Sequence, residues 1–492
     1  MGRNRMSFTD LCQGEFGRKV AYTGVDQITT ENVMQVLSET IGIHNRNRIL
    51  MDYLYRYYKG DQPILYRERN VRPEINNKVV ENHALETVKF KAGQIHGEPI
   101  QYVCKKKKAN ETVNAQIDLL NDYLDEANAD ARNIQLGIYQ SAVGTAYKAI
   151  LKEDEWTEDG DLPPFRIYIP CPWDTYVVYS SGTGKAMLSV QILKDEDNQQ
   201  YCLCYSSKLY FKIQNGNIVK SGINGFDGIP IIEYPNNHDR ISDIEIAITM
   251  FDAINKYQSD RLNGVEQFVQ ALMKFKNCEI DEQEFMKMVK FGAVSVKDIG
   301  NGSQSDVELM TAELNQSESQ VAKDDIYNNM LIVEAMPNRQ SNTGGDTGNA
   351  VYLRNGWDFA ERDAKLVESF TKEAEKAAAR IILNIIRKTS KDIKVSTRDF
   401  DVKITRNPTD NMLVKAQALD YLFKNKIHPL IALITCGLFS DPQKVYEMSL
   451  PYLGTVYPEL ANPETEIQKA QGLLDSYGKQ NTVSLDKDVV SE

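Results

Sequence analysis

The sequence lacks any long run of apolar residues. A membrane-spanning helix needs about 18 of them in succession, and no stretch of the 492 residues approaches that length. The opening residues, MGRNRMSFTDLCQGEF, also lack the apolar core of a secretory signal peptide. We therefore expect neither a membrane contact nor secretion.

Cysteine is scarce, and its pattern is irregular. The seven cysteines are odd in number and scattered: Cys12, Cys104, Cys171, Cys202, Cys204, Cys278 and Cys436. This pattern argues against a disulfide framework and fits a reducing cytosol. Cys202 and Cys204 fall on one face of a predicted strand, where small buried side chains explain them.

The sequence also lacks an excess of positive charge. It has 57 Lys and Arg against 69 Asp and Glu, a net charge of −12. Tight nucleic-acid binding needs clustered cations that neutralise phosphates. The balance argues against such a protein but leaves open one that lets DNA slide past without holding it.

Catalytic and metal-binding motifs are missing as well. The five histidines are far apart, without an HExxH or CxxC partner: His44, His83, His96, His238 and His428. There is no G-x-S-x-G motif, and paired carboxylates on predicted helices are typical of a solvated face. We expect no metal, no cofactor and no enzymatic activity.

One short string, Gly182–Lys185 (GTGK), imitates part of a phosphate-binding loop. A P-loop requires Gly, four residues and then Gly-Lys-Ser/Thr. Here the residue five positions before Gly184 is Tyr179, and Lys185 is followed by Ala186. The string also joins two strand patterns, so we predict a β-hairpin turn.

The first half of the chain predicts helices followed by a β-rich insert. A length of 492 residues allows two to four packing units. Apolar residues recur at helical spacing in four segments: 30–58, 76–97, 110–127 and 129–144. From 164 to 236 the period changes to two, which predicts about six antiparallel strands.

The second half predicts three long helices and a small helical bundle. The helical patterns span about 241–277, 312–336 and 350–388, and Pro337 should end the second. A mixed segment separates the first two helices. A strand is predicted at 400–404, followed by short helices and a disordered tail of about twenty residues.

A glycine-rich loop, Ser341–Arg354 (SNTGGDTGNAVYLR), precedes the third long helix. Glycines before a helix suggest an anion site, but this loop has no lysine, and Asp346 would repel an anion. We predict a mobile loop tip instead. A separate basic run, Lys105, Lys106, Lys107 and Lys108, is typical of a solvated edge. It is also a candidate contact for nucleic acid or an acidic partner.

The order of these parts resembles the portal proteins of tailed double-stranded DNA bacteriophages, particularly long-tailed phages of Gram-positive bacteria. Four motifs carry the resemblance, which extends over about 32–448: YYKGDQPI (57–64), NNKVVENHALETVKFKAGQIHGEPIQY (76–102), GNAVYLR (348–354) and ITRNPTDNMLVKAQAL (404–419). Each motif alone is weak, and their order and spacing give the likeness its weight. The segment between the first two long helices carries no recognisable motif.

The resemblance implies an α+β portal fold with long stem and tunnel helices, a β-rich wing insert and a helical C-terminal crown, assembled into a ring. The implied parts are a flexible N-terminus (1–25), wing (26–240, with its insert at 164–236), stem helix (241–277), clip (278–310), second stem helix (311–337), tunnel loop (338–349), long tunnel and wing helix (350–400), wing strand and helical crown (401–472), and disordered tail (473–492).

Such a ring of about twelve subunits would surround a channel at one capsid vertex, used in DNA packaging and ejection. Implied partners are the terminase large subunit, head–tail connector proteins, scaffold, the major capsid protein and the passing duplex. Implied locations are the virion and, during assembly, the host cytoplasm. The DNA-facing residues would be Asn342, Thr343, Gly344, Gly345, Asp346, Thr347, Gly348 and Asn349, with Arg354 nearby.

The implied role accounts for the composition of the loop. Glycine gives a loop that moves against DNA its freedom, and small polar side chains make no strong contact with the duplex. ATP hydrolysis would belong to the terminase. The alternatives are another phage capsid or neck protein and a nucleotide-dependent enzyme that uses Gly344–Gly348 or Gly182–Lys185.

Overall fold

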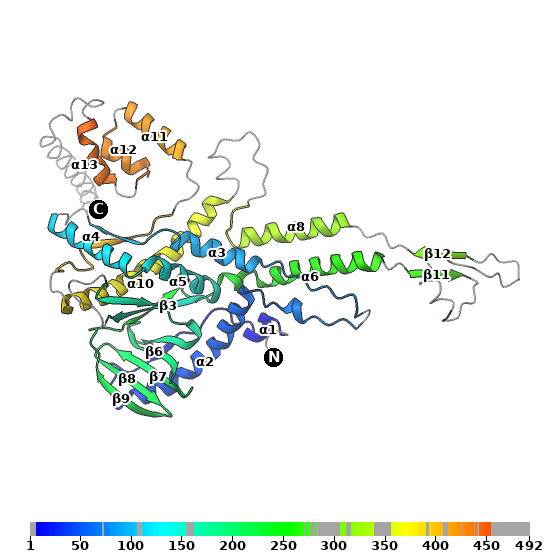
Figure 1. The fold of residues 1–492 in the computed structure, drawn as a ribbon, viewed down its shortest axis with the longest axis horizontal. Helices are drawn as coiled ribbons and strands as arrows, with labels where there is room; N and C mark the ends of the chain where they lie inside the picture. The colour runs from blue at the N-terminus through cyan, green and yellow to red at the C-terminus, as the bar shows by residue number, and fades with distance from the viewer. Residues whose placement is uncertain are drawn as a thin grey trace, which may run out of the picture. The chain divides into compact units, whose positions relative to one another are not determined.

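A computed structural model describes most of the chain (Figure 1). The described residues are 6–70, 73–105, 111–153, 162–269, 272–276, 283, 306–310, 316–338, 356–389, 393–406, 412–425, 427–436, 438–439 and 442–453. Helices and several sheets confirm the α+β class. The chain forms two compact units, 1–406 and 407–492. Among the described residues, no helix is long and apolar enough to cross a membrane.

The described N-terminal residues, 6–25, contain a helix and a strand, although the sequence predicted a flexible segment over 1–25. Helix α1 (Phe8–Cys12) buries Phe8 and Cys12, and strand β1 (Ala21–Thr23) pairs in parallel with β5. The buried Arg18 forms an ion pair with Glu245. The polar composition of the segment gave no signal for these anchors, because Arg18 finds its partner 227 positions away in the sequence.

The predicted β-rich insert divides between two sheets. The larger sheet has the order β1-β5-β6-β7-β8-β9 and is antiparallel except at β1. Its remaining strands are β5 (Thr175–Ser180), β6 (Ala186–Lys194), β7 (Gln200–Ser206), β8 (Leu209–Gln214) and β9 (Asn217–Ile223). The GTGK string forms the turn between β5 and β6, as predicted. Cys202 and Cys204 both pack into the core beneath this sheet.

The smaller sheet has the order β10-β3-β4. It consists of β3 (Thr145–Lys152), β4 (Phe165–Tyr168) and β10 (Ile231–Pro235). All six predicted strands form. The sequence pattern missed β3, whose first six residues are all buried and therefore show no alternation, and β9, whose residues are mostly exposed.

The remaining elements of the first half of the chain are mostly helical. The N-terminal ones are α2 (Val33–Tyr58), α3 (His83–His96), α4 (Glu111–Glu126) and α5 (Ala129–Val143), close to the predicted spans. Short 3-10 helices η2 (Pro63–Tyr66) and η4 (Pro172–Asp174) follow α2 and precede β5. Helices α6 (Asp243–Val269) and α8 (Gln316–Val333) run antiparallel, side by side (Figure 1).

Two long-helix boundaries differ from prediction. Helix α6 ends at Val269, and Leu272–Lys276 forms strand β11, paired with β12 (Asp306–Met310). Leu272 and Phe275 fit a helical period equally well, so a distant pairing decides the structure. Helix α10 (Trp357–Thr389) starts later than predicted because Gly356, at φ +83°, is not helical.

The end of the first unit and the second unit follow the predicted order. Strand β13 (Phe400–Lys403) forms as predicted and pairs with β2 (Gln101–Cys104). Just beyond it, Arg406 Nη2 and Nε lie 3.0 Å from the carboxylate of Glu361 on α10. The second unit contains helices α11 (Met412–Lys424), α12 (Pro429–Cys436) and α13 (Pro442–Leu453) around Leu433 and Tyr446.

Candidate functional site: the base of the segment between α8 and α10

The predicted DNA-facing residues, Asn342–Asn349 and Arg354, lie outside the described residues, as do Lys106, Lys107 and Lys108. Of the predicted site residues, Lys105 is described, and it lies exposed directly after β2. The structure does describe both ends of the glycine-rich segment: the end of α8 and the start of α10. These ends form the candidate site.

Helix α8 ends in a Schellman motif. The amide of Met336 donates to Leu331 O at 2.8 Å, and that of Ala335 donates to Ile332 O at 3.1 Å. Ala335 takes the left-handed conformation, φ +49°, that this motif requires. Pro337 follows, as predicted, and cannot continue the helix. The chain therefore leaves α8 in a fixed direction.

The start of α10 lies against this helix end. A Cβ at Gly356 would lie 3.7 Å from Met336 O and 3.9 Å from the Cα of Pro337. The next residue, Trp357, packs its ring 6.1 Å from that of Phe90 on α3. Both ends of the 339–355 segment are thus held close together on one framework.

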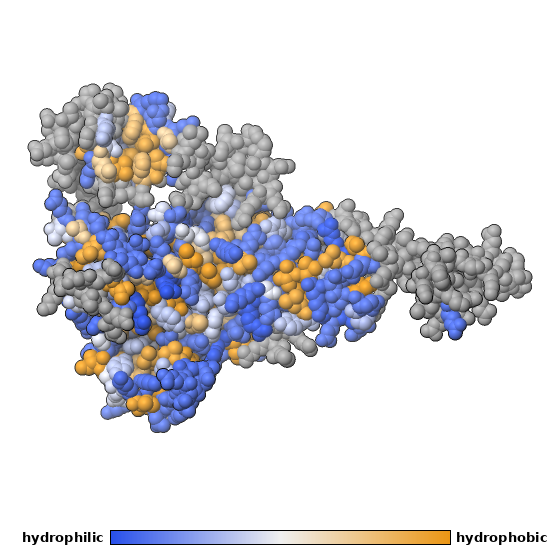
Figure 2. Space-filling model, in the orientation of Figure 1, coloured by the Kyte–Doolittle hydropathy of each residue, from blue (hydrophilic) through white to orange (hydrophobic). Residues whose placement is uncertain are grey.

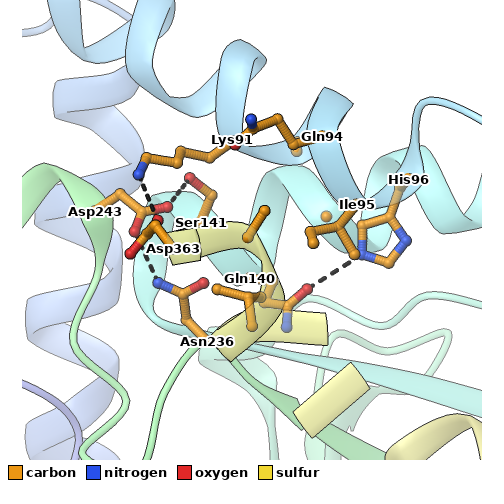
Figure 3. Close-up of a pocket in the computed structure, with 13 residues that line it drawn as sticks. Lys91, Gln94, Ile95, His96, Gln140, Ser141, Asn236, Asp243 and Asp363 are labelled. Atoms are coloured by element: carbon orange, nitrogen blue, oxygen red, sulfur yellow. Dashed lines mark hydrogen bonds and ion pairs between the residues drawn. The ribbon is translucent and has the colours of Figure 1, made fainter. Parts of the chain in front are cut away.

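A buried polar cluster lies behind this base (Figure 3). Lys91 Nζ on α3 donates to Asp363 Oδ2 on α10 at 2.6 Å. At the start of α6, Asp243 accepts hydrogen bonds from Ser141 Oγ at 2.5 Å and from Asn236 Nδ2 at 2.9 Å. The first contact joins α3 to α10, and the other two join the start of α6 to α5 and to Asn236.

Glu334 lies just after α8, two residues before Met336. It is the third carboxyl group near Lys91, after Asp363 and Asp243. It is buried, and neither carboxyl oxygen has a hydrogen-bond partner among the described residues. Burial raises its pKa well above the usual value, and the charges of Asp243 and Asp363 raise it further. Burial acts to lower the pKa of Lys91, but neighbouring carboxylates reverse this and raise it. The cluster thus favours a neutral Glu334 beside a charged Lys91.

A neutral histidine closes the other end of the cluster. His96 Nε2 lies 3.2 Å from Gln140 Oε1, and the Gln140 amide donates to Pro235 O at 3.0 Å. Burial lowers the pKa of His96 to about 4. The ring packs against Gly137 of α5, where a Cβ would lie 2.4 Å from His96 Cδ2. The ring fits here because Gly137 has no side chain.

The cluster is suited to supporting the helices rather than to binding a ligand. Its cavity has a volume of about 10 Å³, room for at most one water molecule. Across the described ranges, no group of three or more His, Cys, Asp or Glu side chains could hold a metal ion. The packed charges fix the helices that carry the 339–355 segment.

A second set of polar contacts holds an extended segment along α6. The amides of Asn77, Val79 and Glu81 donate to Asn263 Oδ1, Ser259 Oγ and Asn255 Oδ1, at 2.7, 2.9 and 2.8 Å. Alternate residues of an extended chain advance about 6.6 Å, and four helical residues advance about 6 Å. The two repeats therefore match along this polar ladder.

The ladder gives a physical role to two of the motifs singled out in the sequence. YYKGDQPI contains Gln62, fully buried, whose amide donates to Tyr57 O at 3.2 Å and whose Oε1 accepts from Asn255. NNKVVEN contains the three amides of the ladder. Both motifs fix backbone onto α6.

Sequence reasoning missed these supporting residues. A signal for Glu334 exists in the string LIVEAMP, where one carboxyl interrupts an apolar run before a proline. Asn255, Ser259 and Asn263 repeat every four residues on α6, which could have indicated a polar seam.

Comparison with known proteins gives two results. A family model described as "Phage portal protein, SPP1 Gp6-like" matches residues 37–449. The portal protein of Bacillus phage SPP1 is 22% identical over 493 aligned residues, covering 92% of this chain and 90% of that protein.

Proposed function

Because the chain belongs to the SPP1 Gp6-like family of phage portal proteins, we propose that it forms a ring of about twelve subunits around a DNA channel. The family places the protein at the capsid vertex, where it serves DNA packaging. In our proposal the ring also serves ejection. It docks the terminase large subunit, which hydrolyses ATP, and later the head–tail connector proteins. Scaffold and the major capsid protein contact it during assembly in the host cytoplasm.

The observation that carries the proposal is the base between α8 and α10. A loop that borders a moving duplex needs a freely jointed tip on a rigid support. Gly356 meets Met336, and the cluster of Lys91 and Asp363 ties α3 to α10 behind them. We propose that Ser341–Asn349 faces the DNA and that Arg354 lies nearest to its phosphates.

Exposed apolar side chains support ring assembly. Val321 and Ile332 are eleven residues apart on α8, which puts them on one helix face, and both are exposed. Phe359 and Leu366 repeat at seven residues on α10 and are also exposed. Figure 2 shows apolar side chains interrupting the polar surface over α6 and α8. Neighbouring subunits would cover these positions.

The charge of the chain fits a conduit. Twelve copies of a chain with net charge −12 carry 12 × −12 = −144. This net charge suits a channel that conducts DNA rather than binding it tightly. The nucleotide-binding alternative loses its support at Gly182–Lys185, since Lys185 lies between two hairpin strands rather than before a helix, whereas Gly344–Gly348 lies outside the described residues.

The test is the mass and shape of the purified protein, by mass photometry and negative-stain imaging. We expect closed rings of about a dozen chains with a central hole. A homogeneous monomer or dimer, both alone and after addition of scaffold protein, would contradict the proposal.

A further inference from the structure

A basic cleft lies along the C-terminal half of α10. Five cationic side chains line it, together with Leu383, Asn384, Ser396 and Thr397: Lys105, Lys376, Arg380, Arg387 and Arg398. The cleft has a volume of about 490 Å³. In a chain whose net charge is −12, this local excess of positive charge needs an explanation.

The cations come from three places in the sequence. Lys376, Arg380 and Arg387 lie on one face of α10, within about 40° of each other around the helix and about 16 Å from first to last. Lys105 and Arg398 come from the facing segments and are tied together, because Lys105 Nζ donates to Arg398 O at 3.3 Å. The fold thus converts scattered residues into one positively charged site.

Among the described residues, one of the five cations is paired with a carboxylate, and a second donates to a backbone carbonyl. Lys376 forms an ion pair with Asp401 at 3.0 Å, and Arg387 donates to Val395 O at 2.5 Å. Within the described part of the chain, no carboxylate pairs with the guanidinium of Arg380 or Arg398, and both side chains are exposed. Their donors are available to a ligand with several anionic oxygens.

The lining favours a phosphate backbone over an acidic protein segment. A protein partner normally inserts apolar anchors into pockets, and the one aliphatic residue that lines this cleft, Leu383, is buried. Three of the five cations are arginines, whose planar forks bind phosphate oxygens in pairs. A cationic row about 16 Å long spans several phosphates of one strand.

We propose that this cleft binds the sugar–phosphate backbone of a nucleic acid without reading its sequence. Arg380 and Arg398 make the direct phosphate contacts, and Lys105, Lys376 and Arg387 supply the surrounding positive potential. The cleft goes beyond the proposed channel contact, because Arg380 lies about 36 Å along α10 from Gly356, at the base of the glycine-rich segment. It is a second, separate DNA contact on the same chain.

The test is fluorescence anisotropy of a labelled DNA duplex of about 20 base pairs with the full-length protein, titrated from about 50 to 200 mM salt. The variant is R380A/R398A. The matched control is R132A/K220A, which removes two exposed cations on α5 and β9 that do not line the cleft. Circular dichroism and thermal unfolding establish that both variants keep the wild-type fold.

We expect the cleft variant to lose about tenfold or more in affinity and to lower the slope of log K against log salt by about 2, with little change in the control. Equal losses in both variants would overturn the proposal, as would a wild-type protein that binds no duplex at low salt. A polyglutamate peptide of equal charge that binds more tightly than DNA, and only to the wild-type cleft, would also overturn it in favour of an acidic protein.

The two proposals fail separately. Failure to form rings changes particle mass but leaves the cleft on each chain. Duplex binding that R380A/R398A retains in full would overturn the cleft proposal and leave the particle mass as it was.

Discussion

The amide of Val79 donates to Ser259 Oγ at 2.9 Å, joining residues that lie 180 positions apart. This hydrogen bond is the middle rung of the ladder that holds Asn77–Glu81 along α6. Because Asn255, Ser259 and Asn263 are buried, losing one acceptor leaves a backbone amide without a partner away from water. The ladder is therefore a structural joint rather than a solvated face.

The first prediction concerns this joint. We expect Ser259→Ala to lower the free energy of unfolding by about 1 to 3 kcal/mol, because it strands the Val79 amide. Lys256→Ala, at an exposed position one turn earlier on the same helix, should change it by less than about 0.5 kcal/mol. Urea denaturation followed by circular dichroism measures both. Equal effects at the two positions would show that the hydrogen bond between Val79 and Ser259 does not stabilise the fold.

The second prediction concerns the packing of His96. Ala is a better helix former than Gly by about 1 kcal/mol, so Gly93→Ala, with open space at its Cβ, should stabilise the protein. Gly137→Ala should instead destabilise it by about 1 to 3 kcal/mol, because the new methyl group meets His96 Cδ2. Thermal unfolding of the two variants should shift in opposite directions. A stabilising Gly137→Ala would contradict the described packing.

The third prediction concerns the pH dependence that Glu334 confers. Its pKa is raised in the folded state, so the native protein retains a proton that the unfolded chain releases near pH 4.5. The stability that this proton provides is present below about 4.5 and is lost as pH rises toward the raised pKa. Glu334→Gln, a neutral isostere, should therefore match the wild type most closely near pH 5 and exceed its stability increasingly toward pH 8.5.

Denaturation at several pH values measures this divergence. It should not exceed about 1.4 kcal/mol per pH unit, the limit for one proton. Glu373→Gln, on the exposed side of α10, should follow the wild-type curve at every pH. A constant offset between Glu334→Gln and the wild type would show that Glu334 does not hold a proton in the folded protein.

The fourth prediction concerns the exposed face of α8. Ile332 is 75% exposed in the single chain. If a neighbouring subunit covers it, Ile332→Asp buries an unpaired charge at the interface, which costs several kcal/mol per contact. We expect mass photometry to find smaller particles with the wild-type circular dichroism spectrum. Ala131→Asp, which adds the same charge to an exposed site on α5, should leave the particle mass unchanged.

The sequence predicted the elements better than their ends or their contacts. Helical periodicity located α6 and α10 because apolar residues repeat on one face of each helix, and residues of that face such as Phe251 and Ile382 are buried. It continued the α6 pattern through Leu272, where pairing with Met310 forms a strand instead. Local patterns carry no information about a partner 38 positions away.

The candidate site was predictable only in outline. Glycine content and Pro337 located the segment and its boundary with α8. The support behind it depends on Lys91 meeting Asp363, a contact between helices 272 residues apart in sequence. The basic cleft was equally hidden, since Lys105 formed part of a visible run while Arg380 and Arg398 joined it through folding alone.

The most direct test of the account is a cryo-electron microscopy map of the assembled ring, with residues 341–349 located. We predict a closed ring in which Ser341–Asn349 of every subunit borders the narrowest part of the central channel, carried by α8 and α10. A closed ring whose narrowest part is formed by other residues, or in which this segment faces outward, would contradict the proposed role of Ser341–Asn349.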